Sequence, residues 1–364
     1  MPGTRDRAPT ALADHRLSLR HFLQKKPAAP RADTNGGRQG LRRCLRNWIA
    51  LYCAAIVCVL IFPSPVRAWG CKGHQVIALL AEKHLTGPAL AMVNEILRAS
   101  PIDPSLSRYC KDGGTDAMAD ASTWPDDIRT LRPETAPWHY IDIPLGTTRR
   151  EVEKYCDPQE QCVTWAISDE LKTLRSADSE PQKRADALRF LIHFVADLHQ
   201  PLHAVSNNDL GGNCVPVAFF DEQPQLRNSQ LEMYAPNLHG VWDTNILERA
   251  TTGKTVEQVA SELNESFRKK IRRWQKGPAN VDSWTWASHQ VAAKYVYAKL
   301  PARVPVESPQ PVRSCAEDNN ISARMLKLNE RLEEPYQRGA VPIIRERLAQ
   351  SGARLALLLN QLWP

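Results

Sequence analysis

The chain has 364 residues, of which 43% are hydrophobic and 24% are charged. This composition is ordinary for a globular protein, and it excludes a wholly disordered chain, a collagen-like repeat and a protein with many membrane spans. Residues 1–68 carry 12 Lys and Arg against three Asp, whereas residues 69–364 carry 35 basic and 37 acidic residues. The net charge of +7 therefore comes from the N-terminal part, and the main body does not bind its partners through bulk positive charge.

An apolar run of 15 residues, 48–62, follows Arg42, Arg43 and Arg46 and precedes the small residues Val66 and Ala68. This order is typical of a secretory signal peptide that is cleaved after Ala68. The alternative is an uncleaved anchor, which would need about 20 apolar residues. We expect residues 1–68 to be a disordered basic leader plus signal peptide. The protein is then secreted or periplasmic, with no stable membrane association after cleavage.

Six cysteines remain beyond Ala68, an even number that indicates three disulfides in an exported chain. Six cysteines allow fifteen pairings, and only the close pair Cys156 and Cys162 suggests a specific bond. Two cysteines separated by two residues do not occur, which disfavours a zinc site built from thiolates.

Residues 69–364 indicate a single, mainly α-helical domain, since they contain no Gly/Ser linker, no fixed-period repeat and few alternating strand patterns. Pro181 suits the first turn of a helix, Thr255 and Gln258 form a candidate capping box, and Asp282 is a candidate N-cap. Apolar periodicity predicts helices over residues 74–85, 89–99, 181–194, 283–300 and 343–362.

Two His–Asp pairs share one spacing: His193 with Asp197, and His239 with Asp243. Residues four apart lie on the same face of a helix, so each pair presents an imidazole and a carboxylate to a common point. His203 follows the first pair closely. A single such pair is usually a surface or capping contact, but two pairs with a third histidine favour a metal site, and these ligands suit zinc.

Five motifs follow one another along residues 69–364: Trp69-Gly-x-x-Gly-His74, Ala121-Ser-Thr-Trp-Pro-Asp126-Asp-Ile-Arg129, Trp138-His139-Tyr140, His193-Phe-Val-Ala-Asp197-Leu-His-Gln-Pro-Leu-His203 and Asn237-Leu-His239-Gly-Val-Trp-Asp243. In this order they resemble the zinc-dependent S1/P1 nucleases, single-strand-specific phosphodiesterases related to bacterial zinc phospholipase C. One motif departs from the family, which usually has Trp-Ala-Asp where this chain has Trp124-Pro125-Asp126. Proline is tolerated at this place if it opens a helical turn.

The resemblance implies a mainly α fold held by disulfides, with a buried cleft for three Zn²⁺ ions. By position, Asp126, His139, His193 and Asp197 hold one ion, and His203, His239 and Asp243 hold a second. A third is held by His74, by Asp197 as a bridge, and by the free α-amine and carbonyl oxygen of Trp69. Spacing alone would not have found Trp69.

The resemblance also implies roles for the remaining motif residues. Asp126 orients or deprotonates the attacking water, and Arg129 neutralises phosphate oxygens. Tyr140 stacks on a base that Asp142 hydrogen-bonds. We therefore expect a monomeric endonuclease that cuts single-stranded DNA and RNA to 5′-phosphorylated products, with 3′-nucleotidase activity as a possible addition. A zinc-dependent phospholipase C and a non-catalytic zinc-binding helical protein are the alternatives.

Overall fold

A computed structural model describes residues 69–110, 116–156, 161–312, 314–316 and 321–364. The leader predicted over residues 1–68, with its apolar run, lies outside the described residues. Within the described residues, no helix combines the length and the apolar character that crossing a membrane requires.

The described part of the chain is mainly helical, as the sequence predicts. The α-helices of the first half are α2 (Cys71–Glu82), α3 (Gly87–Ala99), α4 (Ala117–Ile128), α5 (Val163–Arg175) and α6 (Pro181–Asp197). Those of the second half are α7 (Leu238–Gly240), α8 (Ile246–Ala250), α9 (Val256–Trp274), α10 (Val281–Val291), α11 (Ile321–Leu328) and α12 (Glu334–Leu362). Short 3₁₀ or π turns cover Pro133–His139, Val152–Tyr155, Pro201–Ala204, Val241–Asn245, Ala292–Val296 and Tyr297–Lys299.

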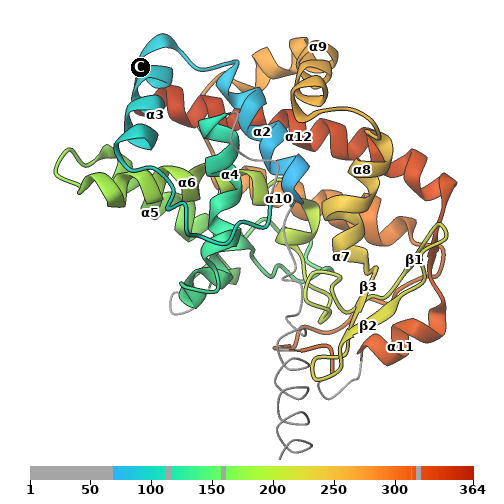
Figure 1. Cartoon of the computed structure of the whole chain (residues 1–364). Helices are drawn as coiled ribbons and strands as arrows, with labels where there is room; N and C mark the ends of the chain where they lie inside the picture. The colour runs from blue at the N-terminus through green and yellow to red at the C-terminus, as the bar shows by residue number, and fades with distance from the viewer. Residues whose placement is uncertain (1–68, 111–115, 157–160, 313, 317–320) are drawn as a thin grey trace, which may run out of the picture. The chain divides into compact units, whose positions relative to one another are not determined.

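Two small sheets complete the described fold. β1 (Ala218–Phe219) pairs in parallel with β4 (Arg331–Leu332), with Ala218 opposite Arg331. β2 (Gln225–Asn228) and β3 (Met233–Ala235) form an antiparallel hairpin, with Gln225 opposite Ala235. Figure 1 shows this hairpin beside α7, at the end of the domain away from α3 and α5.

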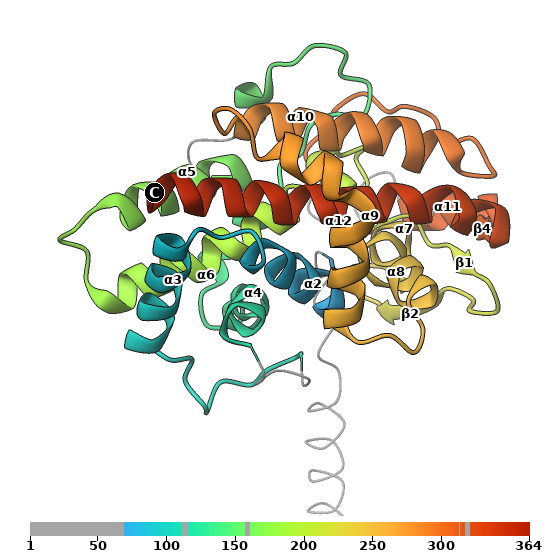
Figure 2. The ribbon, with the colours of Figure 1, turned by 90° about the horizontal axis from the view of Figure 1, so that it is seen from above.

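The long C-terminal helix α12 organises the core. Figure 2 shows it passing between α10 on one side and α2 on the other. It packs against α2, α6 and α9, while α6 packs against α3, α4 and α5. Helix α6 is therefore enclosed by other helices, and its last two turns are completely buried.

Three helix starts can be compared with the sequence predictions. The capping box of Thr255 and Gln258 at the start of α9 is confirmed, with both reciprocal hydrogen bonds present. The sequence prediction of Asp282 as the N-cap of α10 is wrong: the N-cap is Asn280, whose side chain accepts a hydrogen bond from the Ser283 amide. The last helix was expected from residue 343, but α12 begins at Glu334 and runs through Pro342. Proline lacks only one helical hydrogen bond, so a well-packed helix can continue through it.

Pro125 does not open a helical turn. It occupies the interior of α4, which starts at Ala117 with Asp116 as its N-cap, rather than a first helical turn. Proline there removes one hydrogen bond between backbone groups. The missing amide and the bulk of the ring act on the Ala121 carbonyl, one turn earlier, and the helix ends three residues after the proline, at Ile128.

All six cysteines beyond Ala68 are paired. The bond between Cys156 and Cys162 confirms the sequence prediction. Cys71–Cys110 links the start of α2 to the loop before α4, and Cys214–Cys315 spans 101 residues. Closing so long a loop restricts the unfolded chain most strongly.

Candidate metal centre

Helix α6 ends inside the domain and supplies two of the histidine and aspartate side chains that the sequence singled out. His193 and Asp197 lie one turn apart on it and are both fully buried. His193 Nε2 is 3.1 Å from Asp197 Oδ2, so the predicted shared face is present. His74 from α2 stacks on the His193 ring, with ring centroids 4.0 Å apart.

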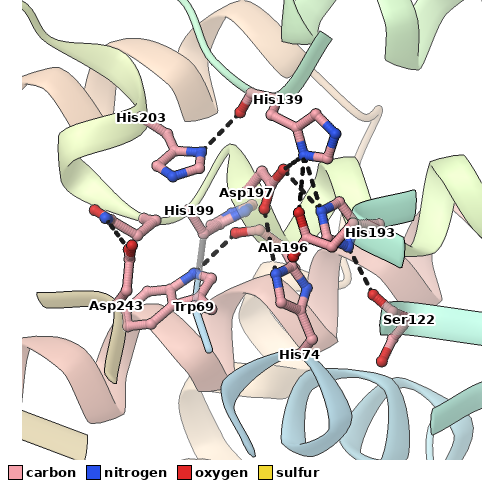
Figure 3. A network of polar contacts seen from close by, with 12 residues as sticks. Trp69, His74, Ser122, His139, His193, Ala196, Asp197, His199, His203 and Asp243 are labelled. Carbon is pink, nitrogen blue, oxygen red and sulfur yellow. Dashed lines mark hydrogen bonds and ion pairs between the residues drawn. The ribbon is translucent and has the colours of Figure 1, made fainter. Parts of the chain in front are cut away.

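Asp197 stands between two groups of side chains, as Figure 3 shows. Its Oδ2 lies 2.9 Å from His139 Nδ1, and its Oδ1 lies 3.4 Å from His74 Nε2. Asp126 extends the first group, with its Oδ1 4.0 Å from His139 Nδ1. One carboxylate therefore has an oxygen directed at each group, which is the arrangement expected of a residue that bridges two ions.

A further group gathers His203, His239 and Asp243. Their ligand atoms lie close enough together to hold one ion, and all three residues are buried. His239 and Asp243 lie on consecutive helical segments, α7 and the π turn Val241–Asn245, with Nε2 and Oδ2 3.3 Å apart. The structure thus brings together all eight predicted side chains: His74, Asp126, His139, His193, Asp197, His203, His239 and Asp243.

Backbone carbonyls fix the orientation of three of these imidazoles. In each, Nδ1 lies 2.7 Å from a carbonyl oxygen, to which it donates its proton: His193 to Ser122, His203 to His139, and His239 to Gly211. A neutral imidazole with a proton on Nδ1 has a lone pair on Nε2. Such outer hydrogen bonds are the usual way in which a protein selects the tautomer of a metal-binding histidine.

These lone pairs test whether the residues fit a metal ion. His203 Nε2 and His239 Nε2 face each other at 3.1 Å, so two acceptors meet unless a cation lies beside them. Two buried carboxylate oxygens, Asp197 Oδ1 and Asp243 Oδ2, accept no hydrogen bond from any described residue. Imidazole nitrogens and carboxylate oxygens are a preferred donor set of zinc. The residues therefore fit the group that the sequence predicts.

Burial favours the uncharged form of most ionisable groups in the cluster. It lowers the pKa of His139 and of His203 well below the usual value and that of His239 to about 4. These rings are neutral at neutral pH, which is the form that binds metal. His193 differs: burial lowers its pKa, but the neighbouring Asp197 and Asp126 carboxylates outweigh burial and raise that pKa above its usual value. Burial raises the pKa of Asp197 to about 6 and that of Asp243 well above its usual range. A bound cation would offset the cost of burying these carboxylates.

The first motif brings Trp69 beside the cluster. Trp69 is fully buried, and its indole Nε1 donates to the Ala196 carbonyl at 2.9 Å, next to Asp197 (Figure 3). The two glycines of the motif make this position possible. A Cβ on Gly73 would lie 2.8 Å from Trp69 Cβ, and a Cβ on Gly70 would lie 2.5 Å from Thr244 Oγ1. The two glycines of the Trp-Gly-x-x-Gly-His pattern are thus required by close packing.

A cavity of about 590 Å³ opens beside the histidines. His139, His203 and His239 line it together with three further residues named from the sequence, Arg129, Tyr140 and Asp142. Arg129 Nη1 lies 3.4 Å from Asp126 Oδ1, and the Tyr140 side chain is 41% exposed. A phosphodiester bond at the histidines would therefore have a guanidinium and an aromatic ring within the same cavity.

Part of the cavity lining is a segment that the sequence did not single out. Glu307 and Pro309–Val312 line the cavity. Asn207 holds this segment through the Pro305 carbonyl and the Glu307 amide, both at 2.9 Å. Asn208 holds the Ser308 carbonyl at 2.7 Å and the Gln310 amide at 2.9 Å. Only the proline-rich composition of residues 301–311 could have indicated a fixed extended segment here.

His199, which lies between ligand positions in sequence, has both ring nitrogens engaged elsewhere. Nδ1 donates to the Val195 carbonyl at 2.7 Å, and Nε2 accepts from Arg354 at 2.9 Å. These contacts give His199 a structural role and leave neither ring nitrogen for a metal ion.

Comparisons with known proteins agree with this geometry. The chain is 28% identical over 327 residues to Endonuclease 5 of Arabidopsis thaliana, covering 85% of this chain and 96% of the relative. It is 26% identical over 323 residues to Endonuclease 2 of the same plant, covering 84% and 94%. With Nuclease S1 of Aspergillus oryzae it shares 27% identity over 222 residues, covering 60% of this chain and 67% of the relative.

The family model described as S1/P1 Nuclease matches residues 69–364. That range begins at Trp69 and contains all five motifs. The chain therefore belongs to the S1/P1 nuclease family and is a hydrolase that acts on the phosphodiester bonds of nucleic acids.

Proposed function

We propose that this chain is an exported, zinc-dependent endonuclease that cuts single-stranded DNA and RNA to 5′-phosphorylated products, with 3′-nucleotidase activity. The observation that carries the proposal is the position of the His–Asp groups, which adjoin a cavity that also contains Arg129, Tyr140 and Asp142. A metal store needs neither a cationic side chain nor an exposed aromatic ring beside its ligands. This combination favours hydrolysis of a charged, base-bearing substrate.

Three zinc ions are proposed, each with its own ligands. Asp126, His139, His193 and Asp197 hold one, and His203, His239 and Asp243 hold another. The third has His74, the second oxygen of Asp197, and the backbone amine and carbonyl of Trp69. The contact of His74 with Asp197 Oδ1 at 3.4 Å supports this bridging role. The hydrogen bond from the Trp69 indole to the Ala196 carbonyl, next to Asp197, places Trp69 beside this group and supports a backbone ligand from the first residue of the mature chain.

The chemistry of the chain's own side chains follows from their positions. Zinc ions bound here would lower the pKa of the attacking water and neutralise charge on the phosphate. The Asp126 carboxylate lies 3.4 Å from the Arg129 guanidinium and 4.0 Å from His139 Nδ1. From this position it is suited to orient that water and to accept its proton. The Arg129 guanidinium donates hydrogen bonds to non-bridging phosphate oxygens through its planar fork.

Substrate choice rests on Tyr140 and Asp142, which line the same cavity. A ring that stacks on a base accepts any of the four bases, so little sequence preference is expected. Bases in a duplex are already stacked on each other, so a stacking site favours single strands and unpaired regions. Asp142 accepts a hydrogen bond from the base edge in this scheme.

Export is supported by the three disulfides, because such bonds persist in oxidising compartments. We propose cleavage after Ala68, which frees the Trp69 amine. The mature domain of residues 69–364 is then a secreted or periplasmic monomer without stable membrane association.

The test is incubation of the purified protein with circular single-stranded DNA, RNA and phosphatidylcholine, each with and without a chelator. We expect cleavage of both circular DNA and RNA, loss of both activities on chelation, and restoration by zinc better than by magnesium. Hydrolysis of phosphatidylcholine alone would favour a zinc phospholipase C. Zinc binding without hydrolysis of any of the three would favour a non-catalytic zinc protein. Full nuclease activity in excess chelator would contradict the metal-dependent mechanism.

A further inference from the structure

A fully buried amide side chain, Gln200, lies beside the second metal group. It follows α6 in the sequence and is 0% exposed. Its backbone amide donates to the Asp197 carbonyl at 2.9 Å, and its own carbonyl accepts from the His203 amide at 3.1 Å. The backbone of Gln200 thus joins one candidate ligand to the next along the chain.

The Gln200 side chain reaches in two further directions. Its Oε1 accepts a hydrogen bond from the Leu202 amide, which makes Gln200 the N-cap of the turn Pro201–Ala204 that carries His203. Its Nε2 donates to Asp243 Oδ1. One side chain therefore contacts both the turn of His203 and the carboxylate of Asp243, which are 40 positions apart in sequence.

The orientation of this amide is fixed by chemistry. A backbone N–H is only a donor, so the oxygen of Gln200 must face Leu202 and its NH₂ must face Asp243. The NH₂ group donates its hydrogen bond to Asp243 Oδ1. The other oxygen, Oδ2, lies 3.3 Å from His239 Nε2 and accepts no hydrogen bond from any described residue. Gln200 thereby leaves one oxygen of Asp243 directed at the histidines.

We propose that Gln200 is a positioning residue for the ion held by His203, His239 and Asp243, which it serves by fixing the rotamer of Asp243 and the turn of His203 together. This inference rests on the proposed zinc site but adds a residue that holds no metal itself. A hydrogen-bond partner of this kind typically changes metal affinity by about 10–100-fold when it is removed.

The test replaces Gln200 by Met, which has a similar length and no hydrogen-bonding amide. A second variant, Gln200→Asn, keeps the amide but is one methylene too short to span both partners. For the purified wild-type protein and each variant, zinc is removed and then titrated back in competition with a chromophoric chelator. Bound zinc is counted by elemental analysis, and folding is followed by circular dichroism. If Gln200→Met does not fold, Gln200→Asn decides the result.

We expect both variants to bind one ion about 10–100-fold more weakly than wild type and to retain the others. The double variant Gln200→Met/Asp243→Ala should bind as many ions as Asp243→Ala alone, because the same ion is affected. Gln337→Met is the matched control: Gln337 is also buried, but its amide donates to the Ile246 carbonyl at 3.0 Å, and it should keep wild-type zinc affinity.

Three other results would contradict these expectations in different ways. Wild-type zinc affinity in folded Gln200→Met and Gln200→Asn, with only a lower melting temperature, would overturn the positioning role and leave the zinc site standing. A wild-type protein that binds no zinc would overturn the proposed function and, with it, this inference. Loss of a further ion in the double variant, beyond that lost in Asp243→Ala, would show that Gln200 does not act on the ion of Asp243.

Discussion

The Nε2 atoms of His203 and His239 face each other at 3.1 Å, while the Nδ1 atom of each ring donates to a backbone carbonyl at 2.7 Å. Burial lowers the pKa of both rings, so an extra proton between them is disfavoured near neutral pH. A metal cation satisfies both lone pairs at once. The same contact is unfavourable when the cation is removed.

We therefore predict that the protein is less stable without metal. Removing zinc with a chelator should lower the melting temperature at neutral pH, and adding zinc in excess should restore it, because binding to the folded state alone stabilises that state. Differential scanning calorimetry with and without chelator measures the effect, with magnesium addition as the control for non-specific salt effects. An unchanged melting temperature after verified zinc removal would contradict a metal site among these residues.

The carboxylates are predicted to differ in importance. Asp197→Asn should cause the largest loss of zinc and of turnover, since Asp197 contacts the histidines of two groups. Asp126→Asn should reduce turnover with less loss of zinc, because Asp126 adjoins one group only. Elemental analysis and initial rates on circular single-stranded DNA give both quantities. His199→Ala is the control and should keep its zinc, since neither ring nitrogen of His199 is available to a metal.

Near-normal turnover and full zinc content in Asp197→Asn would show that Asp197 does not bridge two ions. A zinc deficit in His199→Ala would show that His199 contributes to the site.

Tyr140→Ala should weaken substrate binding more than it slows the chemical step. A base that stacks on the ring contributes about 1–3 kcal/mol, and Tyr140→Phe should retain most of it. The Michaelis constant and kcat for oligonucleotides separate the two effects. Tyr109 is a matched control, because its side chain is also exposed, at 53%, and does not line the cavity. A Michaelis constant that rises equally in Tyr109→Ala, or not at all in Tyr140→Ala, would move the base site elsewhere.

A pH-dependent stability effect is predicted at Glu170 on α5, away from the histidines. Burial, with a smaller contribution from Asp169, raises the pKa of Glu170 from 4.5 to about 7. The folded state thus holds this proton more tightly than the unfolded state. The stabilisation that comes from this tighter proton binding is fully present below about pH 4.5 and is lost as the pH rises through about 7.

Glu170→Gln should consequently match wild type at pH 4.5 and be more stable at pH 8.5, by on the order of 3 kcal/mol at most. Urea denaturation at the two pH values measures the difference. Wild type and variant are compared at the same zinc concentration, which saturates the protein at any pH at which zinc binds. The exposed carboxylate of Glu265 on α9 provides the control, and Glu265→Gln should change stability little at either pH. An equal effect of Glu170→Gln at both pH values would contradict the raised pKa.

The N-terminus of the mature chain gives a further prediction. Only a free α-amine has a lone pair for zinc, so a single Gly before Trp69 should remove one ion and most activity. Trp69→Phe at a correctly cut terminus should keep the ion, because only backbone atoms are proposed as ligands. Zinc content and activity of the three preparations are compared. Equal values for proteins with and without the extra Gly would refute the N-terminal ligand.

The sequence predicted much of the site because its chemistry lies in regular local patterns. His193 with Asp197, and His239 with Asp243, could be paired from helical spacing alone, and their contacts follow that spacing. The capping box at Thr255 is equally local. Residues such as His74, His139 and Asp126 come from distant helices and turns, so only the resemblance to a family could place them beside the pairs.

What could not be predicted depends on tertiary contacts. The N-cap of α10 is Asn280, because its side chain reaches the Ser283 amide. In the sequence, Asn280 and Asp282 are both suitable N-cap residues, so the sequence alone does not decide between them. Asn207 and Asn208 hold a segment about 100 positions away, and no local pattern encodes that pairing. Gln200 likewise acquires its role only when Asp243 is brought to its amide.

The most direct test of the proposed centre is X-ray diffraction at the zinc absorption edge from crystals of the protein beginning at Trp69. We predict three anomalous peaks: one among Asp126, His139, His193 and Asp197, one among His203, His239 and Asp243, and one between His74, Asp197 and the Trp69 amine. Data collected on both sides of the edge identify the metal as zinc. The absence of anomalous peaks at these groups, in crystals grown with zinc, would contradict a trinuclear zinc centre.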